Sequence, residues 1–425
     1  MNSERKILKI VAIASIGGGL EMYDFVIYAF FAPVIGALFF PSKNHFAELL
    51  SAFAVFAIGY ITRPIGAIVF GHFGDTIGRK KTLQITILLM ALATVCIGLL
   101  PTYAQIGISA SILLVIFRLL QGFAVGGDFP GAITFVSEHV ANARRGLHCS
   151  WIYTGINLGL TLATIASSLI TWQLSSDQIQ KFGWRIGFLI GVILAGVGYF
   201  LRKLLEETPY FKVLLKENFV RRFPIKVVFK NHFSLFLKAL GIVCLGAVVV
   251  GHMLFMPSYL HFAAKLSLQK ALLFNTGGSL VWSLFILATG YLSDKWGRRK
   301  IIWASAASLM LFSYPLFSLI ATAKVGYILI GLLGFAICMS GIIGVIASTL
   351  SELFPTHIRN SGIGAAYNIG FALFCSVSPL VMTELAHRFS LEAPSYWIIG
   401  AAIITFISSF TFQETANLPL PNHPS

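Results

Sequence analysis

The sequence predicts an all-α integral membrane protein with twelve transmembrane helices in two pseudo-symmetric six-helix bundles. Three observations support this fold class. Of the 425 residues, 57% are hydrophobic and only 11% are charged, whereas about a quarter of the residues in a soluble domain are charged. At roughly 20 residues per span, the chain accommodates twelve helices with short connections. One motif also recurs at matching places in the two halves.

Apolar runs define the expected spans, and short polar connections separate them. The spans are expected at residues 9–39, 47–71, 82–101, 106–134, 149–171, 184–204, 235–262, 271–292, 301–320, 326–350, 361–386 and 395–413. Residues 1–205 therefore form the N-terminal bundle, 206–234 a central linker, and 235–425 the C-terminal bundle with a short segment after its last span. The basic linker is expected to carry short interfacial helices that contact anionic lipid headgroups.

Basic residues are distributed unevenly between the two sides of the expected bundle. Of the 31 Lys and Arg residues, 22 fall on one side, 7 on the other, and Arg63 and Arg118 lie inside spans. The positive-inside rule places both termini and the linker in the cytoplasm. The net charge of +15 therefore reflects topology, and we expect no nucleic-acid partner. We also expect no removable signal peptide, because no cleavage site of small residues follows the basic N-terminus.

The sequence contains no pattern that indicates an enzyme. Its five cysteines are scattered without metal-type spacing, so neither a metal site nor a structural disulfide is expected. We find no pairing of a nucleophile with a base and no phosphate-binding loop. A cofactor is not expected.

The recurring motif is a charged turn between two spans. Its glycines allow close helix approach and a sharp turn, and its Asp can accept hydrogen bonds from the start of a helix. A single copy is explained equally well as a basic loop that sets topology, but two copies 219 residues apart favour a shared structural role. The two copies are Gly71, Asp75, Gly78 and Arg79, and Gly290, Asp294, Gly297 and Arg298.

This motif resembles the signature loop of the major facilitator superfamily. Residues 21–25 (E-M-Y-D-F), 63–66 (R-P-I-G) and 207–211 (E-T-P-Y-F) are similar to segments of the metabolite:proton symporters of that superfamily, although Met22 stands where their pattern has Trp. The resemblance implies alternating-access transport across a bacterial inner membrane. It also implies a substrate site at mid-bilayer, between halves related by an axis along the membrane normal.

Acidic residues inside spans are costly unless they face a cavity or a partner, and are therefore functional candidates. We expect Asp24 to be the proton-linked acid, with Glu21 and Asp128 as alternatives and with Arg63 as the ionic partner of Asp24. The family pattern usually has Glu at the place of Asp128. An ion pair that only holds the bundle together is the structural alternative for Glu21 and Asp24.

The arginines inside spans favour an anionic substrate, because Arg recognises carboxylates with two hydrogen bonds. Arg118 and Gln121 lie one helical turn apart and are expected to share a face. For His252, a hydrogen bond to a neighbouring helix is an equally good explanation. The expected substrate-binding residues are Tyr23, Tyr28, Arg63, Arg118, Gln121, His252, Tyr259, Asn275 and Asn368.

An acid and an arginine bracket the loop after span four and the loop after span ten. These pairs are Glu138 with Arg145, and Glu352 with Arg359. The resemblance implies that both loops form a cytoplasmic gate, in which the Asp of each signature loop meets the start of span eleven or span five. Solvated ion pairs are the structural alternative.

The sequence therefore predicts a monomeric, proton-coupled importer of a small di- or tricarboxylate. The alternatives are a symporter of a zwitterionic osmolyte such as betaine or proline, a carrier of a bulkier polycarboxylate such as a citrate-type siderophore, and a membrane sensor or receptor that does not transport. Osmosensing betaine and proline members of the subfamily extend into a C-terminal coiled coil. The polar segment after Gln413 lacks heptads, and this difference favours the carboxylate.

Overall fold

A computed structural model of the protein describes the backbone of residues 2–76, 79–203, 224–355 and 358–421. Within these ranges, the side chains of residues 2–6, 71–72, 74–76, 79–80, 83, 202 and 224–225 are not described. Ten helices in this part of the chain are long and apolar enough to cross a membrane. Two shorter apolar helices, Gln84–Leu99 and Pro394–Ser409, complete the twelve that the sequence predicts, so the expected fold class is confirmed.

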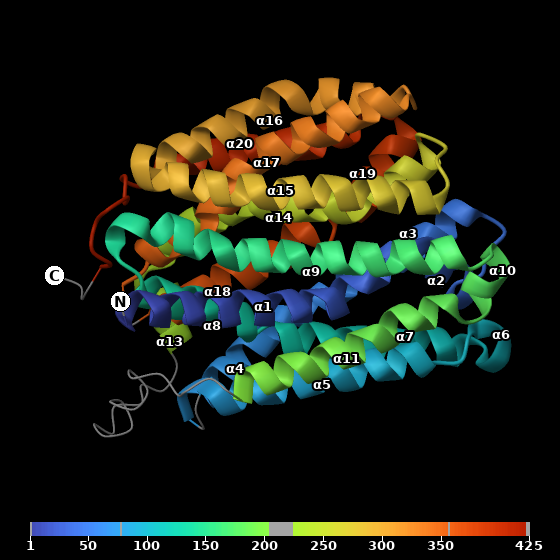
Figure 1. The fold of residues 1–425 in the computed structure, drawn as a ribbon, viewed down its shortest axis with the longest axis horizontal. Coiled ribbons are helices and arrows are strands. Elements are labelled where there is room, and N and C mark those ends of the chain that lie inside the picture. Colours follow the sequence, from blue (N-terminus) through green and yellow to red (C-terminus); the bar gives the residue numbers. More distant parts are fainter. Residues whose placement is uncertain (1, 77–78, 204–223, 356–357, 422–425) are drawn as a thin grey trace.

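The N-terminal half contains the first six spans, three of which are built from two consecutive helices (Figure 1). The spans consist of α1 (Asn2–Phe30) with α2 (Ala32–Phe39), α3 (His45–Ile61) with α4 (Arg63–Thr76), α5 (Arg79–Leu99), α7 (Ile108–Val125) with α8 (Asp128–His139), α9 (Arg145–Gln173) and α11 (Trp184–Lys203). The connections contain the short elements α6 (Tyr103–Ile106), η1 (Asn142–Arg144), α10 (Ser176–Gln178) and η2 (Ile179–Gly183).

The C-terminal half repeats this plan. A short helix, α13 (Pro224–Asn231), precedes it. The spans consist of α14 (Phe233–Phe262), α15 (Leu268–Trp296), α16 (Arg298–Ala321), α17 (Val325–Leu353), α18 (Arg359–Gly370) with η3 (Phe371–Cys375) and α19 (Ser378–Arg388), and α20 (Pro394–Ser409). The last helix ends at Ser409, four residues before the expected boundary at 413, and the next residue, Phe410, stacks on Trp303.

Breaks in three spans place the residues of the candidate site. Span two breaks at Thr62, before Arg63 and Pro64, because a proline ring cannot continue a helix without losing a hydrogen bond. Thr62 Oγ1 instead donates to the carbonyl of Leu119 at 2.7 Å, which joins span two to span four. Span four is interrupted at Gly126 and Gly127, and span eleven contains the π-helical turn η3, a feature that often marks functional sites.

Glycines allow spans two and four to touch backbone to backbone. A Cβ atom at Gly122 would overlap with the carbonyl of Gly59, and one at Gly66 would overlap with the carbonyl of Phe123. Such close approach through small residues is how helices associate in a membrane. This contact between spans two and four fixes the position of Arg63 relative to Arg118 along the two helices.

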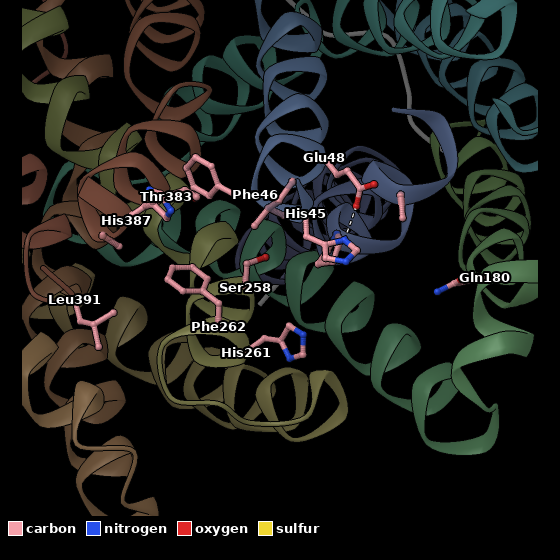
Figure 2. A pocket seen from close by; sticks show the side chains of 14 residues that line it. His45, Phe46, Glu48, Gln180, Ser258, His261, Phe262, Thr383, His387 and Leu391 are labelled. Carbon is pink, nitrogen blue, oxygen red and sulfur yellow. Dashed lines mark hydrogen bonds and ion pairs between the residues drawn. The ribbon is translucent and has the colours of Figure 1, made fainter. Parts of the chain in front are cut away.

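The two halves meet mainly along α9 and α15, which run side by side (Figure 1). Both termini lie at one end of the bundle, here called the terminal face, and the end with α6 and α10 is the opposite face. Toward the opposite face, a pocket of about 720 Å³ opens between the halves. Figure 2 shows that helices of both halves line it, with Phe46 of α3 beside His387 of α19. Their rings stack with centroids 4.0 Å apart.

Candidate functional site

Arg63 lies at the start of α4, is fully buried, and is surrounded by aromatic rings from both halves. Its Cζ atom lies 5.8 Å from the ring centroid of Phe25, 4.9 Å from Tyr60, 5.7 Å from Tyr367 and 5.6 Å from Phe371. We call this group the Arg63 cage. Tyr367 and Phe371 come from span eleven, so the cage closes across the interface between the halves.

The Arg63 guanidinium keeps its hydrogen-bonding capacity. None of its three nitrogens has a partner of normal hydrogen-bond geometry among the described residues. Within the cage, the Tyr367 hydroxyl is close enough to interact with it. A buried donor without an acceptor is costly, and cation–π attraction to the rings offsets part of that cost. The arrangement therefore suits an incoming anionic group that takes up the free donors.

Asn368 extends this site to the break in span four. Its side-chain Nδ2 donates to the carbonyl of Gly126 at 3.0 Å and to that of Gly364 at 2.9 Å. Its Oδ1 has no hydrogen-bond partner in the described part of the chain. Beside it, the Tyr367 ring packs on Phe129 with centroids 4.4 Å apart, and Phe129 in turn contacts Tyr153 at 5.2 Å.

Arg118 is also fully buried, but its donors are partly used. Its Nη1 atom donates to the carbonyl of Phe25 at 3.0 Å and to Oε1 of Gln121 at 2.8 Å, so the expected pairing with Gln121 is present. Gln121 Nε2 donates to Oγ1 of Thr94 at 2.9 Å. The rings of Phe25, Tyr28 and Phe56 cover the guanidinium. Arg118 thus belongs to a polar chain that connects spans one, three and four.

Asp24 does not pair with Arg63, so that prediction is wrong. The carboxylate is 1% exposed, and no ion pair to it exists among the described residues. It packs instead against Gly191 of α11, where a Cβ atom would overlap with Oδ1 of Asp24. Consecutive residues of a helix are about 100° apart around its axis. Phe25 therefore faces Arg63, whereas Asp24 is turned toward span six and Thr94.

The remaining candidates have varied surroundings. The Tyr23 hydroxyl donates to the carbonyl of Gly187 at 2.8 Å, and the Tyr259 hydroxyl to that of Leu391 at 2.7 Å. His252 packs against Phe317 and Phe335, inside the C-terminal half and away from the Arg63 cage. The structure thus does not bring Tyr259 and His252 to Arg63.

The other candidates lie inside the bundle. Glu21, Asp128 and Asn275 are buried on α1, α8 and α15. The Tyr28 hydroxyl donates to the carbonyl of Ala52 at 3.1 Å.

A charged cluster joins the halves at the terminal face. Asp294 accepts the backbone N–H groups of Gly146 at 2.8 Å and Leu147 at 2.9 Å, so the expected contact between a signature-loop Asp and the start of span five is present. Arg298 binds Asp294 at 2.8 Å and Glu352 at 3.2 Å. A carboxylate at a helix N-terminus benefits from both the free N–H groups and the helix dipole.

The bracketing acids and arginines pair across the halves rather than within each loop. Arg145 binds Glu352 at 2.9 Å, and Arg359 binds Glu138 at 2.8 Å. The alternative of solvated pairs is wrong for Arg145 and Glu352, whose side chains are 1% and 2% exposed. Of the first signature loop, Gly78 lies outside the described residues, and the side chains of Gly71, Asp75 and Arg79 are not described. The expected contact of Asp75 with span eleven stays a prediction.

The glycines of the second signature loop explain the tight contact there. A Cβ atom at Gly290 would overlap with Oγ of Ser150 on α9. Gly297 has a φ of +99°, which favours glycine. A further contact between the halves, which the sequence analysis did not single out, is Asn157 of α9, whose Nδ2 donates to the carbonyl of Ser279 and to Oγ of Ser283, both at 2.8 Å.

Residues 14–379 match the Major Facilitator Superfamily. The chain belongs to the major facilitator superfamily. It is 36% identical over 427 residues to the proline/betaine transporter of Salmonella typhimurium, covering 98% of this chain and 85% of the relative. It is 34% identical over 430 residues to the glycine betaine/proline/ectoine/pipecolic acid transporter OusA of Dickeya dadantii, with the same coverage. This superfamily protein is therefore a transporter, and the curated relatives favour the osmolyte alternative over the carboxylate.

Solved structures show the same superfamily fold. The proton:xylose symporter XylE bound to 6-bromo-6-deoxy-D-glucose superposes with a TM-score of 0.77 at 18% identity, covering 98% of each chain. A partially occluded inward-open conformation of XylE from E. coli superposes with a TM-score of 0.72 at 20% identity, covering 96% of this chain and 98% of the other.

Proposed function

We propose that this protein is a proton-coupled symporter that imports a small zwitterion with one carboxylate and a methylated or secondary ammonium group, of the betaine or proline type. The observation that carries the proposal is the Arg63 cage, in which a buried guanidinium with free donors is surrounded by aromatic faces. The curated proline and betaine transporters, similar over nearly the whole chain, support the same substrate class.

The carboxylate of the substrate is assigned to Arg63. A planar guanidinium binds a carboxylate through two parallel hydrogen bonds, and Arg63 has donors free for them. A di- or tricarboxylate needs further cations, but Nη1 of Arg118 already binds Gln121 and the carbonyl of Phe25. All three nitrogens of Arg63 lack a hydrogen-bond partner among the described residues, against only Nε and Nη2 of Arg118, so Arg63 is the guanidinium that we assign to a single carboxylate.

The ammonium group is assigned to the aromatic faces of the cage. Aromatic rings attract quaternary ammonium groups through their quadrupoles, and Tyr60 and Tyr367 lie on opposite halves beside Arg63. The substrate would then be held between span two and span eleven. Its own carboxylate, bound to Arg63, offsets the repulsion between the two positive charges.

Asp24 is the proposed proton carrier. Its carboxyl group is buried between spans one and six without a cationic partner among the described residues, and a charged carboxylate in that position is costly. Thr94, whose hydroxyl accepts from Gln121, also borders Gly191. A chain of hydrogen bonds thus runs from Thr94, near Asp24, through Gln121 to Arg118. Arg118 in turn donates to the carbonyl of Phe25, whose ring belongs to the Arg63 cage.

The proposed topology places the terminal face in the cytoplasm of a bacterium, in line with the distribution of basic residues. The closed charged cluster is then the cytoplasmic gate. The pocket between α3, α14 and α19 is the entrance from outside (Figure 2). The conformation is accordingly outward-facing, and substrate release requires the charged cluster to open.

Uptake by reconstituted vesicles tests the proposal. When the medium outside the vesicles is more acidic than the lumen, labelled glycine betaine should accumulate inside them. Proline should compete with betaine for uptake, and citrate should neither compete nor accumulate. Arg63→Ala should abolish uptake, whereas Arg388→Gln, which alters an exposed arginine at the opposite face, should not. Accumulation of citrate instead of betaine would refute the substrate class. Binding without accumulation would favour the receptor alternative.

A further inference from the structure

The segment that follows α20 folds back over the terminal face, with Glu414 as its anchor (Figure 1). Glu414 Oε1 accepts the backbone N–H of Arg298 at 2.8 Å, and Oε2 accepts that of Arg299 at 3.1 Å. These are the free N–H groups at the start of α16, where the helix dipole favours a negative charge. A Cβ atom at Gly297 would overlap with the Glu414 carboxylate, so this glycine of the signature loop leaves room for the anchor.

Beyond the anchor, residues 415–421, here called the strap, contact the same charged residues that join the two halves. Thr415 Oγ1 donates to Oε2 of Glu352 at 2.6 Å, and Asn417 Nδ2 donates to the carbonyl of Asp294 at 3.1 Å. These two bonds hold the strap to the C-terminal half. The same two acids bind the N-terminal half through other atoms, since Oε1 of Glu352 accepts from Arg145 and Oδ1 of Asp294 accepts from the N–H of Gly146.

The strap then reaches residues that act across the interface. The carbonyl of Leu418 accepts from Nη1 of Arg145, in the N-terminal half, at 3.2 Å. The carbonyl of Pro421 accepts from Nη2 of Arg359 at 3.2 Å, and Nη1 of Arg359 binds Glu138 of the N-terminal half. Arg145 therefore binds one acid and one strap carbonyl at once, both contributed by the C-terminal half.

The strap has a defined local fold that suits this role. Oε1 of Glu414 also accepts the N–H groups of Thr415 and Ala416, both at 3.0 Å, and the N–H of Leu418 donates to the carbonyl of Thr415 at 3.2 Å. Asn417 has a φ of +65°, a conformation that Asn tolerates better than most residues. These turns direct the Leu418 carbonyl toward Arg145.

We propose that the strap, anchored by Glu414, is a latch that stabilises the state in which the terminal face is closed, and that it must release for the halves to separate there. The bond from Arg145 to Leu418 exists only while the two halves are together at this face. Any contact made in one state alone shifts the population toward that state. The strap therefore sets the resting balance between the two orientations of the carrier, independently of which substrate is carried.

Three variants of the full-length protein separate the latch from general disruption. Deletion of residues 418–425 removes the bonds to Arg145 and Arg359 but leaves the anchor. Glu414→Gln keeps the shape of the anchor but removes its charge. Gln413→Ala, next to the anchor at an exposed position, is the matched control.

Pulsed electron resonance between spin-labelled unnatural amino acids at Ala143 and Lys300 reports the separation of the halves, with the five native cysteines left in place. Both positions are exposed at the terminal face, one in each half. The measurement is made without substrate in lipid nanodiscs.

The deletion and Glu414→Gln should each increase the ratio of the long-distance to the short-distance population at least about fivefold, the effect expected when one or two charge-assisted hydrogen bonds are lost. Gln413→Ala should leave the ratio unchanged. If the deletion variant, with its thermal unfolding midpoint within a few degrees of wild type, keeps the wild-type distance distribution, the latch is refuted.

Discussion

The Nη1 atom of Arg145 lies 2.9 Å from Oε1 of Glu352, and this buried ion pair joins the N-terminal half to the C-terminal half at the terminal face. Arg298 binds the same carboxylate at 3.2 Å. Because both arginines are almost fully buried, neither charge is compensated by water when the carboxylate is removed. Glu352 is therefore central to the closed state.

We expect Glu352→Gln to open the terminal face, because it leaves Arg145 without its carboxylate partner and Arg298 with Asp294 alone. Cys149, fully buried on α9 one turn from Arg145, should become accessible. Its reaction with a maleimide in detergent should accelerate roughly tenfold or more, since breaking a buried pair costs several kcal/mol. The control is Asp177→Asn, which breaks an ion pair whose side chains are 71% and 70% exposed. Equal labelling rates in Glu352→Gln and wild type would contradict the gating role.

The Asp24→Asn variant is expected to uncouple transport from the proton. The amide keeps the size of the carboxyl group against Gly191 but cannot exchange a proton. Substrate binding and counterflow in vesicles should survive, while accumulation driven by a pH gradient is lost. An undiminished response to the pH gradient would assign the proton to another acid, such as Glu21 or Asp128.

Gly191→Ala should impair coupling through steric contact alone. The added methyl group overlaps with Oδ1 of Asp24, so the carboxyl group must move. Gly196→Ala, on the same helix, is the matched control, because a Cβ atom there meets nothing within 4 Å. We expect the pH-driven uptake rate of Gly191→Ala to fall severalfold while that of Gly196→Ala stays near wild type. Equal rates would show that the contact with Asp24 is unimportant.

Changes at Tyr367 test the aromatic part of the cage. Tyr367→Phe keeps the ring beside Arg63, whereas Tyr367→Leu removes it. If the ring binds the ammonium group, KM for betaine should rise about 2- to 30-fold in the Leu variant, which corresponds to the 0.5–2 kcal/mol of a cation–π contact. The Phe variant should stay close to wild type. A rise in KM as large in the Phe variant as in the Leu variant would show that betaine binding depends on the Tyr367 hydroxyl instead of the ring.

The fold and the pairing at the second signature loop were predictable because they rest on local patterns. Apolar run lengths define spans, and Asp294 with Gly290 and Gly297 keeps the spacing of a tight turn. The surroundings of Asp24 were not predictable, because a difference of one residue on a helix separates the face toward Arg63 from the face toward Gly191.

Contacts between distant spans were also beyond the sequence. The Arg63 cage combines Phe25 and Tyr60 with Tyr367 and Phe371, which lie more than 300 positions further along the chain. Nothing local in the sequence indicates that these rings meet. The substrate prediction depended on counting intramembrane arginines, whereas the structure distinguishes Arg118, whose Nη1 has internal partners, from Arg63, whose three nitrogens have none among the described residues.

Equilibrium binding to the purified protein tests the central claim, that Arg63 holds the single carboxylate of a zwitterionic substrate. Calorimetric titrations should compare glycine betaine with choline, which has the same ammonium group but no carboxylate, and with citrate. We predict that wild type binds betaine and neither of the others, and that Arg63→Lys weakens betaine binding at least about tenfold because the two parallel hydrogen bonds are lost. Tighter binding of choline or citrate than of betaine, or unchanged betaine affinity in Arg63→Lys, would contradict the account.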